Sequence, residues 1–397
     1  ATLKARTTAT NNTVVGYSAG TAITSGAGHT IVGTNAGEAL TTGTDNSILG
    51  LRAGATMTTG YANVVIGKDS NRLGTTNVRN VVIGEDAMYN NTTGNYNVAI
   101  GWSAGYGGSG ATGYQNVWMG ASAGSSITTG YGNVGVGYQA LRYNTVGVKN
   151  VAIGEGAMET YVGTGSYGQH VAIGYYALRY ATTATEGNVA VGESSLYYLT
   201  TGTFNTAVGI GTLGAITTGS NNVAMGRNAL DVHTGDASVG IGVNAAISHT
   251  SGDNIIVIGV NAAPSTTTIS NEITLGNTDI ATLRCQVQTI SALSDRRDKK
   301  DIKELPVGLD FINDLKPVKF TWNMRDGAKV GVQEVGFVAQ DLDKSQQDAD
   351  AEDYLSLVLK NNPDKLEASY GKLVPVLVKA VQELSQQVEE LKEKLNG

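Results

Sequence analysis

Residues 97–101 read Asn97-Val98-Ala99-Ile100-Gly101, and the same five residue types return at 150–154. Aligning the chain on an apolar residue followed by glycine extends this pattern to sixteen copies, most of them 17 residues apart and none outside a spacing of 16 to 20. A fixed period of this kind marks a repeat architecture. We call the last residue of each motif its coil glycine; the coil glycines are Gly16, Gly33, Gly50, Gly67, Gly84, Gly101, Gly120, Gly137, Gly154, Gly174, Gly192, Gly209, Gly226, Gly242, Gly259 and Gly276.

The period itself predicts the fold of residues 11–276. Seventeen residues are too few for a helical hairpin, and many copies carry a second glycine seven residues before the coil glycine, which disfavours helix. A short strand, a tight turn, a second segment and another turn make one winding of a parallel β-solenoid. At the ~4.8 Å spacing of paired strands, about sixteen coils would form a rod roughly 75 Å long.

The residues that precede the coil glycine predict which side chains fill the interior of each coil. The residues one and three before it are usually apolar, and their alternation predicts that they share the buried face of a strand. Small residues two before it, such as Ala152 and Gly240, would then allow close approach of another chain. Asparagine stands four before it in eleven copies, with His29 and His170 in its place twice, which predicts a hydrogen-bonded ladder along the stack.

The composition changes abruptly near residue 293. Residues 1–293 hold 14 acidic and 11 basic residues, whereas residues 294–397 hold 20 and 16, and 47 of the 53 glycines precede Ser294. We therefore expect a lead-in over residues 1–10, the repeats over 11–276, a strand-like connector over 277–293 and a separate domain over 294–397. Cys285 in the connector is expected to be a buried small apolar residue rather than a reactive thiol.

The C-terminal domain is expected to be a compact α+β fold. Its pattern predicts a helix over 305–315, strands over 318–322 and 334–338, a mobile acidic loop over 341–353 and a helix from Tyr370 onward. That last helix carries a heptad seam, which predicts a coiled coil with a partner. Valine at one core position and leucine at the other favours two strands over three, so the heptads alone do not establish a trimer. The seam consists of Val374, Leu377, Val381, Leu384, Val388, Leu391 and Leu395.

The net charge and the amino-acid composition of the chain argue against several classes of function. A net charge of −7 argues against nucleic-acid binding, and one cysteine with four scattered histidines predicts no disulfide, no metal site and no cofactor. No apolar run approaches the ~20 residues that span a bilayer, so no membrane insertion is expected. The chain begins at Ala1 rather than methionine, so we expect an upstream segment that attaches it to a larger assembly.

The segment at the compositional boundary, Leu293-Ser294-Asp295-Arg296-Arg297-Asp298-Lys299, can carry chemistry. A serine hydroxyl becomes a nucleophile when a neighbouring base takes its proton, and a lysine serves as that base when burial or nearby cations depress its pKa. Lys299 is five residues from Ser294 and can fold back to it. The alternative reading is a solvated turn or helix start of mixed charge.

The aromatic residues of the repeats suggest a second kind of site. Trp102, Tyr138 and Tyr175 each follow a coil glycine directly, and they are candidates for a sugar-stacking surface, although tyrosine also simply suits strands and turn edges. Glycan-cleaving β-helices usually need paired carboxylates. Here Glu85, Glu155 and Glu193 follow coil glycines in coils that are not adjacent, so catalysis by the repeats is not expected.

The repeat motif resembles the head of the trimeric autotransporter adhesins, a left-handed parallel β-roll of three chains. The resemblance rests on Asn-Val-Ala-Ile-Gly and covers residues 11–276, although the period in that family is shorter. It implies a trimeric β-roll and says almost nothing about the ligand.

Three ordered stretches of the C-terminal domain resemble the intramolecular chaperone of the S74 peptidase family, which ends phage endosialidases, tailspikes and tail fibres. They are 294–302 (SDRRDKKDI), 336–342 (GFVAQDL) and 370–375 (YGKLVP), the last followed by 380–384 (AVQEL). The resemblance implies a domain that assembles the trimer, guides folding of the β-structured fibre before it, and releases itself once by cutting the bond before the serine. That bond is Leu293–Ser294 here, with Ser294 as nucleophile, Lys299 as base and Arg297 and Asp295 in supporting roles.

These observations together predict a viral tail fibre or tailspike that attaches to a host surface, with a host receptor of glycan type. It would be made in the host cytoplasm and reside in the virion as a homotrimer. Three alternatives remain: a bacterial trimeric adhesin, a glycan-degrading tailspike, and a chaperone domain that stays attached without cutting.

Overall fold

The structure is a computed structural model, and it describes residues 8–163, 168–182, 185–280, 282–284, 286, 294–325, 327 and 329–396. It divides into two compact units, residues 1–277 and 278–397, each of which is described by itself. Three features expected from the sequence, namely the start of the lead-in, Cys285 and Leu293, lie outside the described residues.

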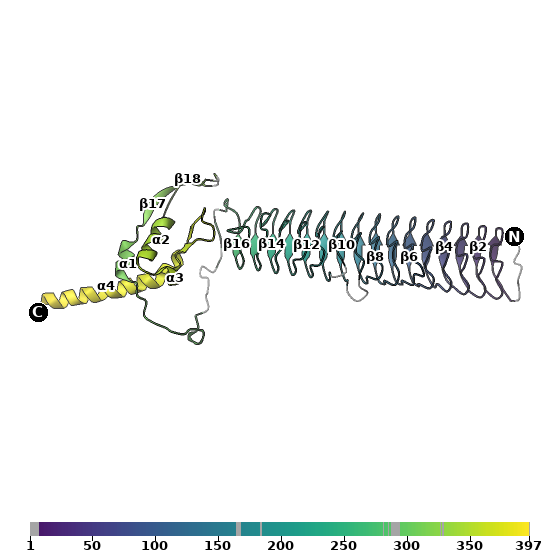
Figure 1. Ribbon diagram of the computed structural model, residues 1–397, viewed down its shortest axis with the longest axis horizontal. Coiled ribbons are helices and arrows are strands. Elements are labelled where there is room, and N and C mark those ends of the chain that lie inside the picture. Colours follow the sequence, from purple (N-terminus) through teal and green to yellow (C-terminus); the bar gives the residue numbers. More distant parts are fainter. Residues whose placement is uncertain are drawn as a thin grey trace. The chain divides into compact units, whose positions relative to one another are not determined.

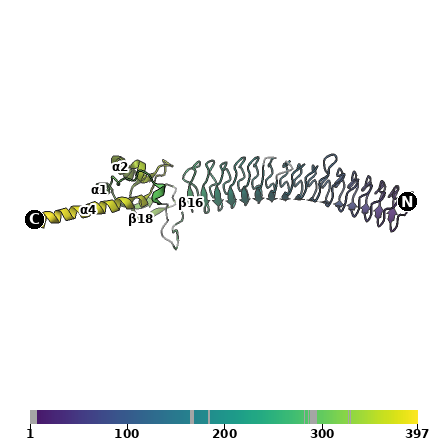
Figure 2. The ribbon, with the colours of Figure 1, turned by 90° about the horizontal axis from the view of Figure 1, so that it is seen from below.

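The first unit is a parallel β-solenoid, as the 17-residue period predicts (Figure 1). Each coil contributes one strand of 3 residues directly before its coil glycine, and the strands stack in chain order as one 16-stranded parallel sheet. Figure 2 shows the strands in a row along one side of the solenoid. They are β1 Thr13–Val15, β2 Thr30–Val32, β3 Ser47–Leu49, β4 Val64–Ile66, β5 Val81–Ile83, β6 Val98–Ile100, β7 Val117–Met119, β8 Val134–Val136, β9 Val151–Ile153, β10 Val171–Ile173, β11 Val189–Val191, β12 Thr206–Val208, β13 Val223–Met225, β14 Val239–Ile241, β15 Ile256–Ile258 and β16 Ile273–Leu275.

Gly137 shows why glycine ends each motif. Its φ is +130°, a backbone conformation that side chains with a Cβ rarely adopt, and an added Cβ would lie 2.6 Å from the carbonyl oxygen of Gly154 in the next coil. The coil glycines therefore let the backbone turn sharply after each strand while successive coils stay in contact.

The strand face that points into the coil is the opposite of the one predicted from the sequence. Ala99 and Ala152, in the middle of β6 and β9, are 0% exposed and point into the coil, whereas Ile153 beside its coil glycine is 38% exposed. The small residues therefore fill the interior of their own chain and do not admit another. The reason is space, because residues four and seven after the coil glycine, such as Leu141 and Tyr161, also fill the narrow interior.

The first and third residues of the strands consequently form a row of apolar side chains on the outside of the single chain, which we call the outer strand face. Members of this row next to a coil glycine that are at least 36% exposed are Val15, Leu49, Met119, Ile153, Ile173, Met225, Ile241, Ile258 and Leu275.

The asparagine ladder forms as predicted. Nδ2 of Asn133 donates to Oδ1 of Asn116 (3.1 Å) and to the carbonyl oxygen of Gly147 (2.8 Å). Its own Oδ1 accepts from N and Nδ2 of Asn150. The histidines at this position keep the ladder, since Nδ1 of His170 accepts from the backbone N of Asn188 at 3.1 Å. The ladder thus satisfies backbone groups that the coil turn would otherwise bury unpaired.

The coil that follows Gly67 interrupts the apolar interior. Two apolar clusters fill the solenoid, one ending at Val65 and the other beginning at Val82. Between them lie Asn71 and Asn77, both 0% exposed. Oδ1 of each, and Nδ2 of Asn71, have no hydrogen-bond partner within the described residues, a feature that the sequence analysis missed.

The second unit is a small α+β fold. Strands β17 (Val318–Asn323) and β18 (Val330–Gly336) pair antiparallel, as do the short strands β19 (Val358–Leu359) and β20 (Glu367–Ala368). The α-helices are α1 (Leu309–Asp314), α2 (Ala339–Asp348), α3 (Glu352–Leu355) and α4 (Leu373–Asn396), with 3₁₀ turns at Arg296–Asp298 and Tyr370–Lys372. Its core contains Val307, Phe311, Leu342, Leu355, Leu357, Leu373 and Val376.

Three predictions for this region need correction. The segment 341–353 is not a mobile loop, because α2 and α3 occupy most of it, with Leu342, Ser345 and Gln346 buried and the acidic side chains outside. The helix predicted over 305–315 is shorter, starting only at Leu309. No strand occurs among residues 277–280, 282–284 and 286, the described part of the supposedly strand-like connector.

Helix α4 has two different parts. Leu373, Val376 and Ala380 at its start are buried against the rest of the unit. The heptad residues are exposed along its whole length, from 40% at Val388 to 84% at Leu395. The predicted helix and its apolar seam are therefore present, and the seam has no partner within the described single chain.

Candidate functional site

A single 3₁₀ turn brings Ser294 and Lys299 together. Oδ1 of Asp295 caps the turn Arg296–Asp298 by accepting from the backbone N of Arg297 (2.8 Å), and the N of Lys299 closes it on the carbonyl oxygen of Arg296. Lys299 then folds back, so that Nζ lies 2.6 Å from Oγ of Ser294 and 3.3 Å from its carbonyl oxygen. A hydroxyl and an amine at this distance can exchange a proton directly.

Arg297 and Asp295 face each other rather than the serine. The guanidinium Nη2 of Arg297 lies 2.6 Å from Oδ2 of Asp295, and Nε contacts both carboxylate oxygens at 3.1 Å. Hydrogen bonding to Arg297 lowers the pKa of Asp295, and the same contact raises the pKa of Arg297. The pair therefore holds the turn in its capped shape and supports the placement of Lys299 indirectly.

The segment is open to solvent in the single chain. Every residue from Ser294 to Ile302 is exposed, and Leu293, on the other side of the expected cut, lies outside the described residues. The geometry therefore joins the nucleophile to its base, and it leaves the reacting pair without a covering wall. The alternative reading of a solvated, mixed-charge turn describes this exposure equally well.

The three aromatic candidates of the solenoid are all exposed but do not form one site. Trp102 is 56% exposed and stands on a coil four windings from that of Tyr175. Tyr138 accepts a hydrogen bond from Gln139 at 3.0 Å. Tyr175 contacts Tyr176, with ring centroids 4.0 Å apart, and there it joins a larger group of tyrosines that the sequence analysis missed. Two members of this group, Tyr180 and Tyr198, share the sixth position after the coil glycines Gly174 and Gly192 of two consecutive coils, which is the sequence signal that links them.

The acidic residues that follow coil glycines are separated, as their coils predict. Glu85 forms an ion pair with Lys68 at 2.5 Å, and Glu155 and Glu193 follow strands β9 and β11, which are not neighbours in the sheet. Nothing in their placement resembles the paired carboxylates of a glycoside hydrolase.

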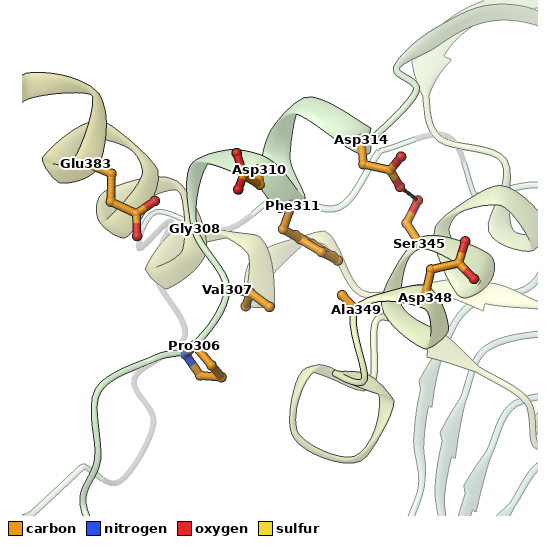
Figure 3. Close-up of a pocket in the computed structure, with 10 residues that line it drawn as sticks. All are labelled: Pro306, Val307, Gly308, Asp310, Phe311, Asp314, Ser345, Asp348, Ala349 and Glu383. Carbon is orange, nitrogen blue, oxygen red and sulfur yellow. Dashed lines mark hydrogen bonds between the residues drawn. The ribbon is translucent and has the colours of Figure 1, made fainter. Parts of the chain in front are cut away.

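A pocket in the second unit lies apart from Ser294 (Figure 3). Its volume is about 410 Å³, and four carboxylates contribute to its wall. Two of them are engaged, since Asp314 accepts from Oγ of Ser345 at 2.7 Å and Glu383 accepts from the backbone N of Leu309 at 2.7 Å. The lining residues are Pro306, Val307, Gly308, Asp310, Phe311, Asp314, Ser345, Asp348, Ala349 and Glu383.

Within the described ranges, no three histidine, cysteine or acidic side chains come close enough together to hold a metal ion. Among those same residues, no helix has the length and apolar character needed to cross a bilayer.

Comparison with known proteins bears on the second unit alone. No curated protein and no solved structure matches the chain. The family model of the S74 peptidases, described as the chaperone of endosialidase, matches residues 294–350, which begin at Ser294 and include Lys299. This match supports a C-terminal chaperone domain of the S74 peptidase type.

Proposed function

We propose that this chain is a phage tail fibre or tailspike protein whose solenoid serves attachment to the host surface. Its C-terminal domain drives assembly of a homotrimer and then cuts the Leu293–Ser294 bond. The observation that carries the proposal is the 2.6 Å contact between Lys299 Nζ and Ser294 Oγ, at the first residue of the segment that matches the chaperone family.

The chemistry follows from the position of the nucleophile beside the bond it attacks. Lys299, as the neutral amine, takes the proton of Ser294 Oγ while this oxygen bonds to the carbonyl carbon of Leu293. The C–N bond then breaks, and Lys299 returns the proton to the departing amine of Ser294. Water hydrolyses the resulting ester, which leaves a carboxylate on Leu293 and restores the serine hydroxyl. One peptide bond is hydrolysed and no cofactor is consumed.

This mechanism needs cover over the reacting pair. A lysine acts as a base only in its neutral form, which burial favours and exposure does not. Because Ser294 and Lys299 are exposed in the single chain, we place the missing cover in the neighbouring copies of the trimer. Cutting would then be coupled to assembly, since an unassembled chain would keep its chaperone.

Two unpartnered apolar surfaces support assembly into a trimer. The outer strand face presents valine, isoleucine, leucine and methionine along the solenoid, and the heptad residues of α4 are 40% to 84% exposed. A contiguous exposed apolar surface of this kind usually marks an interaction site. Near-identical coils can pair out of register almost without penalty, so a domain that aligns the chains at one end removes the main route to misassembly.

We also propose binding partners and a location for the protein. The solenoid would bind a host glycan, a tail or baseplate protein would be a further partner, and the protein would be made in the host cytoplasm and carried in the virion. One other function has a specific observation in its favour. The exposure of Ser294 and Lys299 also suits a chaperone domain that is retained as a trimerisation tip and never cuts.

Intact mass of the purified, denatured protein tests the proposal. We expect the wild type to split between Leu293 and Ser294, and we expect Ser294→Ala and Lys299→Arg to give uncut trimers. Lys316→Ala is the matched control, because it removes an exposed cation that is not part of the capped turn and should leave cutting intact. An uncut wild-type trimer would establish the retained tip, and a cut in Lys299→Arg would remove Lys299 from the role of base.

A further inference from the structure

The largest aromatic group among the described residues of the solenoid lies on two neighbouring coils. Tyr175, Tyr176 and Tyr180 follow the coil glycine Gly174, and Tyr197 and Tyr198 follow Gly192. We call these five residues, with Arg179 between them, the tyrosine patch. They stand on the segments that follow strands β10 and β11, so they are not part of the outer strand face.

The rings of the tyrosine patch touch one another. Tyr180 and Tyr198 lie parallel, with an interplanar angle of 4° and centroids 5.8 Å apart. Tyr197 meets both of them edge to face, at 5.2 Å and 4.6 Å. Tyr176 connects this group to Tyr175, with centroids 4.0 Å apart. Because each ring rests on a neighbour and the backbone beneath is held by the sheet, little side-chain freedom remains to be lost on binding.

Arg179 sits at the centre, and its guanidinium group is already engaged by neighbouring side chains. Its guanidinium carbon lies 4.1 Å from the ring centroid of Tyr176 and 5.2 Å from that of Tyr180. Nη2 pairs with Glu159 at 2.9 Å, Nε donates to the same carboxylate and Nη1 donates to the hydroxyl of Tyr197. Its role is to hold the rings in place, and it shares the nearly buried Glu159 with Arg142, which lies 3.9 Å from the same carboxylate.

The patch nevertheless presents ring surface and hydroxyl groups to solvent. Tyr175 is 45% exposed, Tyr180 37% and Tyr198 53%. Exposed tyrosines offer an apolar ring with a polar end, which gives a large contact area at little cost in rotamer freedom. A sugar has the same two characters, since its ring carries C–H groups on its faces and hydroxyls at its edge.

We propose that the tyrosine patch is the glycan-binding site of the solenoid and that it takes an uncharged glycan. This inference rests on the proposed attachment function and names the surface and the ligand class for it. Arg179 is the one cation of the patch and each of its guanidinium nitrogens already has a partner, so the patch offers no free cation to pair with the charges of a polyanion such as nucleic acid. Trp102 and Tyr138 stand outside the patch and are not part of the site.

Binding of the purified full chain to an array of uncharged and anionic oligosaccharides tests this assignment, followed by titration of any bound sugar. We expect the wild type to bind uncharged glycans, and Tyr180→Ala and Tyr198→Ala each to weaken binding about tenfold. Tyr17→Ala is the matched control, because Tyr17 is 77% exposed on the distant coil of Gly16 and its loss should leave affinity unchanged. Tyr198→Phe separates ring from hydroxyl and should retain most of the affinity.

Three results would overturn the assignment: a wild type that binds no uncharged glycan, one that binds only anionic glycans, and binding that survives in both alanine variants. Far-UV circular dichroism confirms that each variant is folded, and Tyr198→Gln replaces Tyr198→Ala if the latter fails to fold. The intact-mass assay measures cleavage independently of glycan binding. Cutting without glycan binding rejects only the tyrosine patch, and glycan binding by an uncut chain supports the patch while rejecting self-processing.

Discussion

Glu383 on α4 caps helix α1 from a position 74 residues away in the sequence, its Oε2 lying 2.7 Å from the backbone N of Leu309. The N-cap residue of α1 is Gly308, which has no side chain for this purpose. A Cβ at Gly308 would lie 2.3 Å from Oε2 of Glu383, so the glycine makes room for the remote carboxylate. The long helix is thereby held to the body of the second unit through one hydrogen bond and the buried side chains near its start.

Replacing Glu383 by alanine should loosen this junction. The loss leaves the N–H of Leu309 unpaired, and a lost helix cap costs about 0.5–2 kcal/mol. We expect the second unit to unfold at correspondingly lower urea, and we expect Gly308→Ala to act in the same direction. Glu393→Ala, on the exposed far part of α4, is the control and should change stability by less than about 0.5 kcal/mol. Equal stability of Glu383→Ala and Glu393→Ala would show that the cap contributes nothing.

The asparagine ladder should tolerate histidine far better than an apolar residue of similar size. Asn133→Leu removes the amide donor and acceptor, so the N–H of Asn150 loses its acceptor and the carbonyl oxygen of Gly147 keeps only the 3.5 Å contact from Nδ2 of Asn144. A buried polar group left without its partner costs about 1–3 kcal/mol. Asn133→His keeps an acceptor for the next coil, as His170 does for Asn188. Thermal unfolding should therefore rank wild type, histidine and leucine in that order, and a leucine variant as stable as the histidine variant would contradict the ladder's role.

Acid should weaken the solenoid through its buried histidines. Burial lowers the pKa of His170 and of His233 to about 4, from 6.5 in an ordinary setting. Between these two pH values the histidines are protonated in the unfolded chain and neutral in the folded solenoid. The free energy of unfolding therefore falls as the pH drops from about 6.5 to about 4, and these histidines do not change it above pH 6.5. The loss amounts to about 3 kcal/mol per histidine. Urea unfolding at pH 7.5 and pH 4.5 measures it.

The matched variant for this effect is His170→Asn, which installs the residue that eleven other coils carry at this position. It should be close to the wild type in stability at pH 7.5 and more stable than the wild type at pH 4.5. The same dependence on pH in both proteins would mean that His170 does not carry a depressed pKa.

The heptad residues of α4 should determine whether the chains associate into a trimer. Leu384 is 48% exposed in the single chain, and Leu384→Asp places a charge in the proposed helix interface. We expect light scattering to report a trimer for the wild type and a smaller species for this variant, with cutting at Leu293–Ser294 lost as well. Gln387→Asp, on the same helix outside the heptad seam, is the control. A Leu384→Asp protein that stays trimeric would place the interface elsewhere.

The repeat made much of the solenoid predictable. Gly137 and Asn133 occupy positions that recur coil after coil, so their roles in the turn and in the ladder follow from the period alone. The alternation around Ile153 predicts a strand, but it does not say which face points inward, because three-residue strands with apolar residues on both faces satisfy either choice. Only the side chains four and seven residues after the coil glycine, which compete for the same interior, decide it.

The second unit and the sites were less predictable. The acidic residues of 341–353 suggested a loop, whereas Leu342, Ser345 and Gln346 place one buried stripe on α2. The spacing of Ser294 and Lys299 predicts that the lysine can reach the serine, and the capped turn that places Nζ 2.6 Å from Oγ depends on Asp295. The tyrosine patch was missed because its members stand at four different positions after their coil glycines, and the repeat pattern does not show which of these rings meet.

An internal coil of the solenoid pairs its strand with the coil before it and the coil after it, and most coils also share a rung of the asparagine ladder with their neighbours. A gene that gains or loses the codons of one complete winding therefore encodes a shaft whose strands can still pair in the same way. Unequal recombination between such similar stretches of DNA can lengthen or shorten the shaft in whole windings, while the tyrosine patch and the C-terminal domain are inherited intact.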